Sequence, residues 1–233
     1  MTASFQSALI VGAGMGLSAA LARRLVHSGC SVALAARDIG KLESLCAETG
    51  AAAFPCDAQD PAEVTKLFDA VGRFAGPPDV VIYNASARVR GPFTTLAPDD
   101  VRRALMVGAF GAFLVAQRAV PAMLEKGRGA ILFTGASASV KGYAESAPFA
   151  MAKFALRGLA QSMARELAPK GIHVAHFVID GAIRPRGRDD NDDSTLDPDA
   201  IAQTYMNVLM QPRSAWTWEV EVRPWVERFS SVE

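Results

Sequence analysis

Three glycines follow the first apolar run of the chain and precede an amphipathic segment. They are Gly12, Gly14 and Gly16, in the stretch Gly12-Ala13-Gly14-Met15-Gly16-Leu17-Ser18. Glycines in such a turn let the backbone bend tightly and approach a pyrophosphate, while the helix that follows supplies free N–H groups and a positive dipole end. This placement predicts nucleotide binding. The alternative is a tight turn with a purely structural role.

The end of the second apolar run carries the residues that would select the nucleotide. It reads Ala35-Ala36-Arg37-Asp38. At this point an acidic residue hydrogen-bonds the ribose 2′-hydroxyl of NAD, whereas an arginine pairs with the 2′-phosphate of NADP. Ala36 falls in the slot of the acid and Arg37 follows it, so we expect NADP(H) rather than NAD(H). Asp38 keeps NAD open, because a shift of one residue would bring its carboxylate to the ribose, and Arg37 could also be a solvated residue.

Metal chemistry is not indicated by the remaining candidate ligands. These are Asp189, Asp190, Asp192 and Asp193 in one polar segment, then His27, His173 and His176, and finally Cys30, Cys46 and Cys56. The acidic run could hold a metal but is more typical of a solvated loop. The histidines lack the spacing of metal ligands, and the odd number of widely spaced cysteines predicts free thiols in a reducing compartment.

The elements that position these residues belong to an ordinary globular chain. It has 233 residues, 50% of them hydrophobic and 21% charged, and its 24 basic and 24 acidic residues give a net charge of zero. This length favours one domain, residues 1–233. A neutral chain without a basic stripe argues against nucleic acid or an anionic membrane surface as partner. The N-terminus has no basic region before an apolar run, and no run of ~20 apolar residues is free of charges, so we expect a cytoplasmic protein without a signal peptide or membrane span.

Short apolar strands alternate with helical patterns along most of the chain. The predicted strands are 7–12, 31–36, 51–56, 79–83, 129–134 and 172–179, and the predicted helices are 17–27, 39–49, 61–74, 99–124 and 146–168. Asp60 is the expected N-cap of the third helix, with Pro61 at its first position. Continuously apolar strands joined by helices predict a parallel sheet covered on both faces, the doubly wound α/β fold.

The tail departs from this alternation. Residues 184–199 are polar and predict a loop, 200–210 predict a helix, and 218–222 alternate apolar and acidic residues as a seventh strand with one wetter face does. We expect residues from about 182 to 233 to form a small substrate region of the same domain.

Several motifs together resemble those of the short-chain dehydrogenase/reductase (SDR) family, over nearly the whole chain. Val11 to Ser18 resembles the family's TGxxxGxG turn, with Ser18 in place of the last glycine. The other matching segments are Cys56-Asp57-Ala58, Tyr83-Asn84-Ala85-Ser86, the lysine Lys153 of YxxxK, and Val178 to Ile183 around the family's PG pair, where Asp180 replaces the proline. The resemblance implies a Rossmann-type fold and a nicotinamide cofactor.

The resemblance also implies which residues contact the cofactor. Those positions are Gly12, Gly14, Met15, Gly16, Leu17, Arg37, Asp57, Ala58, Asn84, Ala85, Ser86, Lys153, Gly181 and Ile183. Asp57 would hold the adenine amino group, and Lys153 would bond the nicotinamide ribose hydroxyls. Lys153 could instead be a helix lysine whose ammonium stays in water.

The catalytic positions of the family are replaced. Phe149 stands at the YxxxK tyrosine, Ala136 at the usual serine, and Gly108 at the helix asparagine. The spacing puts Phe149 and Lys153 on one helix face, but a phenyl ring has no exchangeable proton. Loss of a placed proton donor removes about 10²–10⁴-fold in rate, so ordinary ketone reduction needs another acid.

Two other residues are candidates for the missing chemistry beside Lys153. Tyr143, in the loop before the helix, is a candidate proton donor whose pKa could be lowered by Lys153, although loop tyrosines are usually surface residues. Ser137 is a candidate oxyanion donor, or else a strand-end hydroxyl bonded to backbone. Some family members that reduce enoyl thioesters also lack the YxxxK tyrosine. The comparison of this chain with those enzymes is an analogy.

The sequence therefore predicts an NADP(H)-dependent oxidoreductase of the SDR type with a non-standard proton donor, acting on a small carbonyl or enoyl compound. The alternative is an NADP(H)-binding pseudoenzyme that acts as a sensor or an assembly partner. The resemblance further implies a homodimer or homotetramer, paired through small-residue faces at Gly108 to Ala116 and Ala147 to Leu159.

Overall fold

A single parallel sheet organises the computed structural model, which describes residues 5–185 and 187–226. Seven strands lie in the order β3-β2-β1-β4-β5-β6-β7, and every neighbouring pair is parallel. They are β1 (Ser7–Val11), β2 (Ser31–Ala36), β3 (Ala52–Pro55), β4 (Val80–Tyr83), β5 (Gly129–Thr134), β6 (Ile172–Ile179) and β7 (Glu219–Val222). The predicted doubly wound fold and each of its strands are confirmed.

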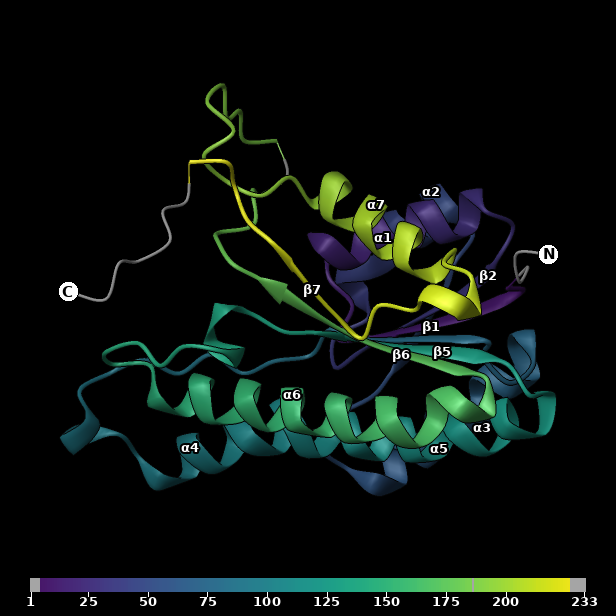
Figure 1. Cartoon of the computed structure of the whole chain (residues 1–233), viewed down its shortest axis with the longest axis horizontal. Helices are drawn as coiled ribbons and strands as arrows, with labels where there is room; N and C mark the ends of the chain where they lie inside the picture. Colours follow the sequence, from purple (N-terminus) through teal and green to yellow (C-terminus); the bar gives the residue numbers. More distant parts are fainter. Residues whose placement is uncertain (1–4, 186, 227–233) are drawn as a thin grey trace.

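Helices cover both faces of the sheet (Figure 1). On one face lie α1 (Leu17–His27), α2 (Glu43–Thr49) and α7 (Pro198–Leu209). On the other lie α3 (Pro61–Ala75), α4 (Pro98–Leu105), α5 (Gly111–Lys126) and α6 (Ala147–Leu167). Each layer closes its own apolar core against the sheet, so β1, β5 and β6 are buried along their whole length. Burial on both faces explains why these strands are continuously apolar.

The N-cap predicted for α3 is present. The Asp60 carboxylate accepts hydrogen bonds from the backbone N–H groups of Ala62 at 2.8 Å and Glu63 at 3.3 Å, and Pro61 takes the first helical position. These bonds satisfy donors that a helix start leaves without a partner. Asp60 therefore fixes where the loop after β3 ends.

Two predicted helices are interrupted. The segment expected to be helical over 39–49 begins as a 3₁₀ turn, η1 (Gly40–Leu42), before α2. The long helix expected over 99–124 contains a π-helical turn, η3 (Met106–Phe110), between α4 and α5. Gly108 lies inside that turn, where a Cβ atom would come within 2.7 Å of the Ala152 Cβ on α6. The interruption thus coincides with a very close helix contact, which a residue pattern along one helix does not reveal.

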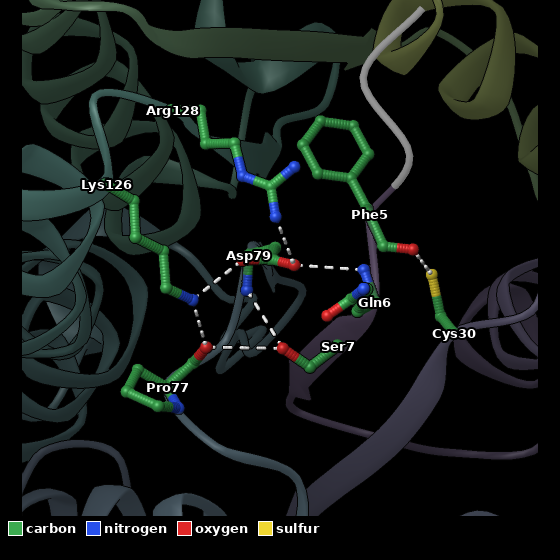
Figure 2. Close-up of polar contacts among 8 residues, drawn as sticks. All are labelled: Phe5, Gln6, Ser7, Cys30, Pro77, Asp79, Lys126 and Arg128. Atoms are coloured by element: carbon green, nitrogen blue, oxygen red, sulfur yellow. Dashed lines mark hydrogen bonds and ion pairs between the residues drawn. The ribbon is translucent and has the colours of Figure 1, made fainter.

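A buried carboxylate ties the amino ends of β1 and β4 together (Figure 2). Asp79, 2% exposed, accepts hydrogen bonds from the Gln6 backbone N–H at 2.9 Å and from Lys126 Nζ at 2.8 Å. Arg128 lies 3.8 Å from the same carboxylate. Burial alone would raise the pKa of Asp79, but these donors outweigh it and the pKa is lowered. This end of the sheet is therefore fastened by charge, opposite the end that carries the glycine turn.

The run from Pro98 to Lys126 is long and apolar enough to satisfy a simple length-and-composition test for a membrane span. Core helices of soluble proteins pass the same test. Here one side of α5, with Ala112, Val115 and Ala119, packs into the core beside α3 and α6.

Candidate functional site

The strand order reverses between β1 and β4, which are adjacent strands near the middle of the sheet. The loop after β1 leads to α1 on one face, and the loop after β4 leads to α4 on the other. A parallel sheet opens a crevice at the carboxyl ends of two such strands. Asn84 lies at this point, where its backbone N–H donates to the Val11 carbonyl at 2.8 Å. The glycine turn and the Asn84-Ala85-Ser86 segment therefore lie side by side at the crevice.

Gly12 is required by the fold of this crevice. Its φ is +82°, and a Cβ atom would lie 2.3 Å from the Ala85 backbone nitrogen. Ser18 Oγ donates to the Gly12 carbonyl at 3.3 Å and accepts from Asn84 Nδ2 at 2.8 Å. The side chain that replaces the family's last glycine thus fastens the turn to the loop after β4.

Gly14 and Gly16 have a different role, because nothing lies within 4 Å of a Cβ atom built on either. The absence of side chains leaves the outer side of the turn clear, directly before the N-terminus of α1 at Leu17. Such an open turn at a helix start suits a pyrophosphate. These residues therefore fit a bound dinucleotide.

A cavity of about 360 Å³ opens beside this turn. Met15 and Gly16 form part of its wall, and Arg184 and Arg188 face it from the loop after β6. Arg184 pairs with Asp197, which precedes α7. We did not single out Arg184 and Arg188 from the sequence, because only the fold brings the tail back over the turn.

The residues expected at the adenine end follow β2 and β3. Arg37 is exposed directly after β2, and no ion pair of its side chain is found within residues 5–185 and 187–226. Asp38 instead pairs with Lys41 at 3.1 Å. Asp57, after β3, accepts from both the backbone and the side-chain amide of Gln59, and the following Ala58 is buried. Arg37 is thus available to an anion, whereas the Asp38 carboxylate already has a cationic partner.

Lys153 is almost completely buried on α6. It is 3% exposed, and its Nζ donates to the Thr134 carbonyl at the end of β5 at 2.7 Å. Burial lowers its pKa to about 8. The helix lysine with a solvated ammonium, which the sequence left open, is not what the structure shows.

Phe149 lies one turn before Lys153, and two cations approach its ring. The Lys153 Nζ is 5.7 Å from the ring centroid, and the Arg88 guanidinium carbon, from the loop after β4, is 5.5 Å from it. Sequence reasoning missed Arg88, which carries no motif and reaches α6 only through the fold. The loop after β4 therefore meets α6 at the Phe149 ring.

The other two positions compared with the family's catalytic residues, Gly108 and Ala136, lie in or beside short turns. Gly108 is packed against Ala152, which leaves no room for an asparagine side chain between α6 and the π-helical turn. Ala136 precedes a short 3₁₀ turn, η4 (Ser137–Ser139), and its backbone N–H donates to Ser139 Oγ at 3.2 Å. Ser137 is half-buried in that turn. No hydrogen bond of its Oγ is found in the described part of the chain, so its hydroxyl is free to meet a ligand.

Tyr143 lies farther out, 44% exposed in the loop before α6. Its phenol interacts with Lys141, whose Nζ donates to the buried Asp180 carboxylate at 3.3 Å. Burial lowers the pKa of Lys141, but Asp180 and the phenol outweigh it and raise that pKa overall. The contacts found for Tyr143 thus lead to Lys141 rather than to Lys153.

A buried histidine, His176, lies behind the site. Its contacts could not be foreseen from the spacing of the histidines in the sequence. His176 on β6 is fully buried, and its Nδ1 lies 3.1 Å from Glu219 Oε2, which also accepts from Arg157 at 2.6 Å. Within the described residues its Nε2 has no hydrogen-bond partner, and this atom would lie 2.3 Å from a Cβ at Gly135. Burial lowers the pKa of His176 to about 4. A neutral imidazole therefore lies directly behind the strand end that receives Lys153.

The remaining predicted positions lie at the start of the tail. Gly181 has a φ of +154°, and a Cβ atom there would lie 2.8 Å from Pro224. Ile183 forms a parallel bridge with Leu196. In the acidic run, Asp190 accepts from Ser194 and Thr195, and no cluster of three candidate metal ligands occurs among residues 5–185 and 187–226.

The fold and the crevice define a class of protein, and comparisons with known sequences agree. Residues 6–189 match the family model described as short chain dehydrogenase. The chain therefore belongs to the short-chain dehydrogenase/reductase family of oxidoreductases, as its motifs indicated.

Individual relatives are similar over almost the whole chain. An uncharacterized oxidoreductase of Staphylococcus aureus is 28% identical over 223 residues, which cover 93% of this chain and 96% of that one. The crystal structure of a short-chain dehydrogenase from Rhodopseudomonas palustris shares 36% identity with a TM-score of 0.82, covering 94% of this chain and 99% of that one. A metagenomic short-chain oxidoreductase solved in complex with NADP shares 28% identity with a TM-score of 0.84, covering 95% and 98%.

Proposed function

We propose that this chain is an NADP(H)-dependent oxidoreductase of the SDR type that acts on a small carbonyl or enoyl compound. The observation that carries the proposal is the pairing of an open glycine turn with a buried lysine at the same crevice. Gly14 and Gly16 leave the turn clear, and Lys153 places an ammonium group at the end of β5. A relative solved with NADP supports the choice of ligand.

The proposed contacts follow the two halves of the cofactor. Arg37, exposed and without an ion pair in the described residues, would hold the 2′-phosphate of NADP. The turn from Gly12 to Leu17 would receive the pyrophosphate. Asp57, Ala58, Asn84, Ala85 and Ser86 would border the adenosine and its ribose, and Gly181 and Ile183 the nicotinamide end.

The cofactor and the protein would contribute different parts of the reaction. When bound, the nicotinamide supplies or accepts the hydride. Lys153 would bond the nicotinamide ribose, and Ser137 would offer its hydroxyl to a substrate oxygen. Tyr143 is the candidate proton donor of the loop before α6, and residues from about 182 onward would shape the substrate pocket.

A thermal-melt titration with NADP(H) and NAD(H) tests cofactor binding. A ligand that binds only the folded state raises the melting temperature once its concentration exceeds the dissociation constant. We expect NADPH to raise it far more than NADH, and Arg37→Gln to remove that difference. A flat response to all four nucleotides would refute the proposal.

A second candidate function is an NADP(H)-binding sensor or assembly partner. Phe149 favours it, because a phenyl ring one turn before Lys153 cannot transfer a proton. NADPH binding together with no NADPH oxidation by any ketone, aldehyde or enone would support this function over the enzyme.

We also propose a cytoplasmic homodimer or homotetramer paired through α5 and α6. These helices expose Phe113, Met151 and Phe154, and Phe110 at the end of η3 is also exposed and stacks on Phe113 with ring centroids 6.2 Å apart. Exposed aromatic and methionine side chains are typical of interface cores. Light scattering after size exclusion should show a dimer or tetramer that Phe113→Glu with Phe154→Glu dissociates.

A further inference from the structure

Arg88 is a cation at the site that makes no ion pair with a carboxylate of the residues that the structure describes. Its side chain is exposed, and its only contact found in residues 5–185 and 187–226 is the Phe149 ring, 5.5 Å from the guanidinium carbon. Lys153 approaches the same ring, and its Nζ donates to a neutral carbonyl. Both cations thus lie within 6 Å of the centroid of the ring at position 149, and a negative charge bound beside that ring would be stabilised by a nearby cation.

The loop that carries Arg88 is held in place on both sides. Asn84 begins it with a backbone hydrogen bond to β1, and Gly91 ends it with an N–H bond to the Glu145 carbonyl at 3.0 Å. Glu145 belongs to the loop that leads into α6, three residues before Pro148. The loop that carries the guanidinium is therefore bonded at one end to β1 and at the other to the loop before α6, and the guanidinium lies over the Phe149 ring.

The chemistry available to Arg88 differs from that of a phenol. A guanidinium stays protonated in proteins, so it cannot deliver a proton, but it presents fixed N–H donors to an oxyanion. An alkoxide formed from a ketone is strongly basic and needs a proton as it forms. An enolate spreads its charge between oxygen and carbon, so it can be held by hydrogen bonds and protonated afterwards at carbon.

We propose that Arg88 is a catalytic residue that holds the carbonyl oxygen of an α,β-unsaturated substrate and stabilises its enolate. This inference rests on the proposed function, because it needs reduced nicotinamide as hydride source. The β-carbon receives hydride from NADPH, the π electrons of the carbon–carbon double bond move to form the enolate, and Arg88 binds its oxygen. Water then protonates the α-carbon, which leaves the saturated carbonyl compound, NADP⁺ and hydroxide.

The proposal is tested with an enolate mimic before any substrate is needed. 4-Nitrophenolate carries a negative oxygen on a planar carbon, and its absorbance reports binding directly. It is titrated into protein loaded with NADP⁺, using wild type, Arg88→Gln, Arg88→Lys and Arg90→Gln. Arg90 is the matched control, because it is exposed on the same loop and has no ring contact or ion pair in the described residues.

We expect Arg88→Gln to weaken 4-nitrophenolate binding by at least about tenfold, Arg88→Lys to weaken it less, and Arg90→Gln to change it less than about twofold. With NADPH and 2-cyclohexenone, any product should be cyclohexanone. Failure of the loaded wild type to bind the phenolate, equal binding by wild type and Arg88→Gln, or formation of 2-cyclohexenol would overturn the proposal.

The melt titration with NADPH, run on the same variants, separates this inference from the proposed function. We expect an unchanged NADPH response in Arg88→Gln. A normal NADPH response without phenolate binding overturns the role of Arg88 alone. The absence of any NADPH response overturns both.

Discussion

The Lys153 ammonium lies 5.7 Å from the centroid of the Phe149 ring, one helical turn away. The lysine of the YxxxK spacing thus lies beside a residue 149 whose phenyl ring has no hydroxyl. The chemistry of this chain therefore depends on which other group transfers a proton or stabilises an oxyanion.

Phe149→Tyr should create ketone reductase activity. The new phenol would lie beside Lys153, and a placed proton donor contributes about 10²–10⁴-fold to rate. NADPH oxidation by a panel of small ketones measures the gain. Phe154→Tyr is the control, since Phe154 is an exposed phenylalanine of the same helix, and within the described residues its ring has no contact with the Lys153 ammonium. Equal rates of ketone reduction by wild type and Phe149→Tyr would show that another group already supplies the proton in the wild-type protein.

Lys153→Met should stabilise the protein without cofactor and weaken NADPH binding. Burial lowers the Lys153 pKa from 10.5 to about 8, so holding the charge at pH 7 costs roughly 3 kcal/mol, offset by about 1 kcal/mol from the Thr134 hydrogen bond. We expect a gain of about 1–2 kcal/mol in urea unfolding at pH 7. Because the unfolded chain binds more protons between pH 8 and 10.5, wild-type stability should rise across that window, and the variant should lack this rise. A loss of stability in Lys153→Met would contradict the assignment of burial as the dominant effect.

Gly12→Ala and Gly14→Ala should separate folding from ligand binding. At Gly12 the φ of +82° and the approach to Ala85 make a side chain costly, so the melting temperature should fall by several degrees. At Gly14 a Cβ meets open space, so the fold should be unaffected while NADPH binding weakens at least about tenfold. Circular dichroism melts with and without NADPH measure both effects. Unaltered NADPH affinity in Gly14→Ala would argue that the turn is only structural.

His176 should make the protein lose stability in mild acid. Its folded-state pKa of about 4 lies below the ordinary value of 6.5, so the unfolded chain takes up a proton first as the pH falls. Stability should therefore drop between pH 6.5 and 4, by about 3 kcal/mol from this residue. His173, whose pKa burial also lowers, acts in the same direction. Urea unfolding of His176→Leu should show a clearly flatter pH dependence than wild type, and identical slopes would count against this prediction.

Asp79→Asn should destabilise the amino end of the sheet. The variant loses the charge that Lys126 and Arg128 approach, at an expected cost of about 1–3 kcal/mol at pH 7 (Figure 2). Because the folded-state pKa of Asp79 is lowered, its contribution is present above the unfolded value near 3.8 and disappears as the pH falls through the folded value. Unfolding free energies of the two proteins should converge in strong acid. A constant difference at all pH values would assign the loss to packing instead.

Much of this architecture could be predicted from the sequence because its signals are local. Continuously apolar strands, the Asp60 cap and the glycine turn each act over a few neighbouring residues, and each lies in the structure within about two residues of its expected place. Lys153 could be singled out for the same reason, through its spacing from Phe149 on one helix.

The rest depends on contacts between distant segments. Arg88 meets Phe149 across a loop and a helix, and His176 meets Glu219 across two strands, so neither pair has a periodic signal. Tyr143 could be noticed from its position, but the bond of its neighbour Lys141 to Asp180 follows only from how the loop returns to the end of β6. The π-helical turn at Gly108 likewise reflects the neighbouring helix rather than its own sequence.

The contact between Gly108 and Ala152 also limits which residues can be introduced at position 108. A Cβ at Gly108 would lie 2.7 Å from the Ala152 Cβ, so an asparagine at 108 does not fit while Ala152 keeps its side chain in this place. Ala152 would first have to become glycine, at a cost of about 1 kcal/mol in a helix interior. Positions 108 and 152 are therefore coupled, and a side chain can enter at 108 only together with a smaller residue at 152.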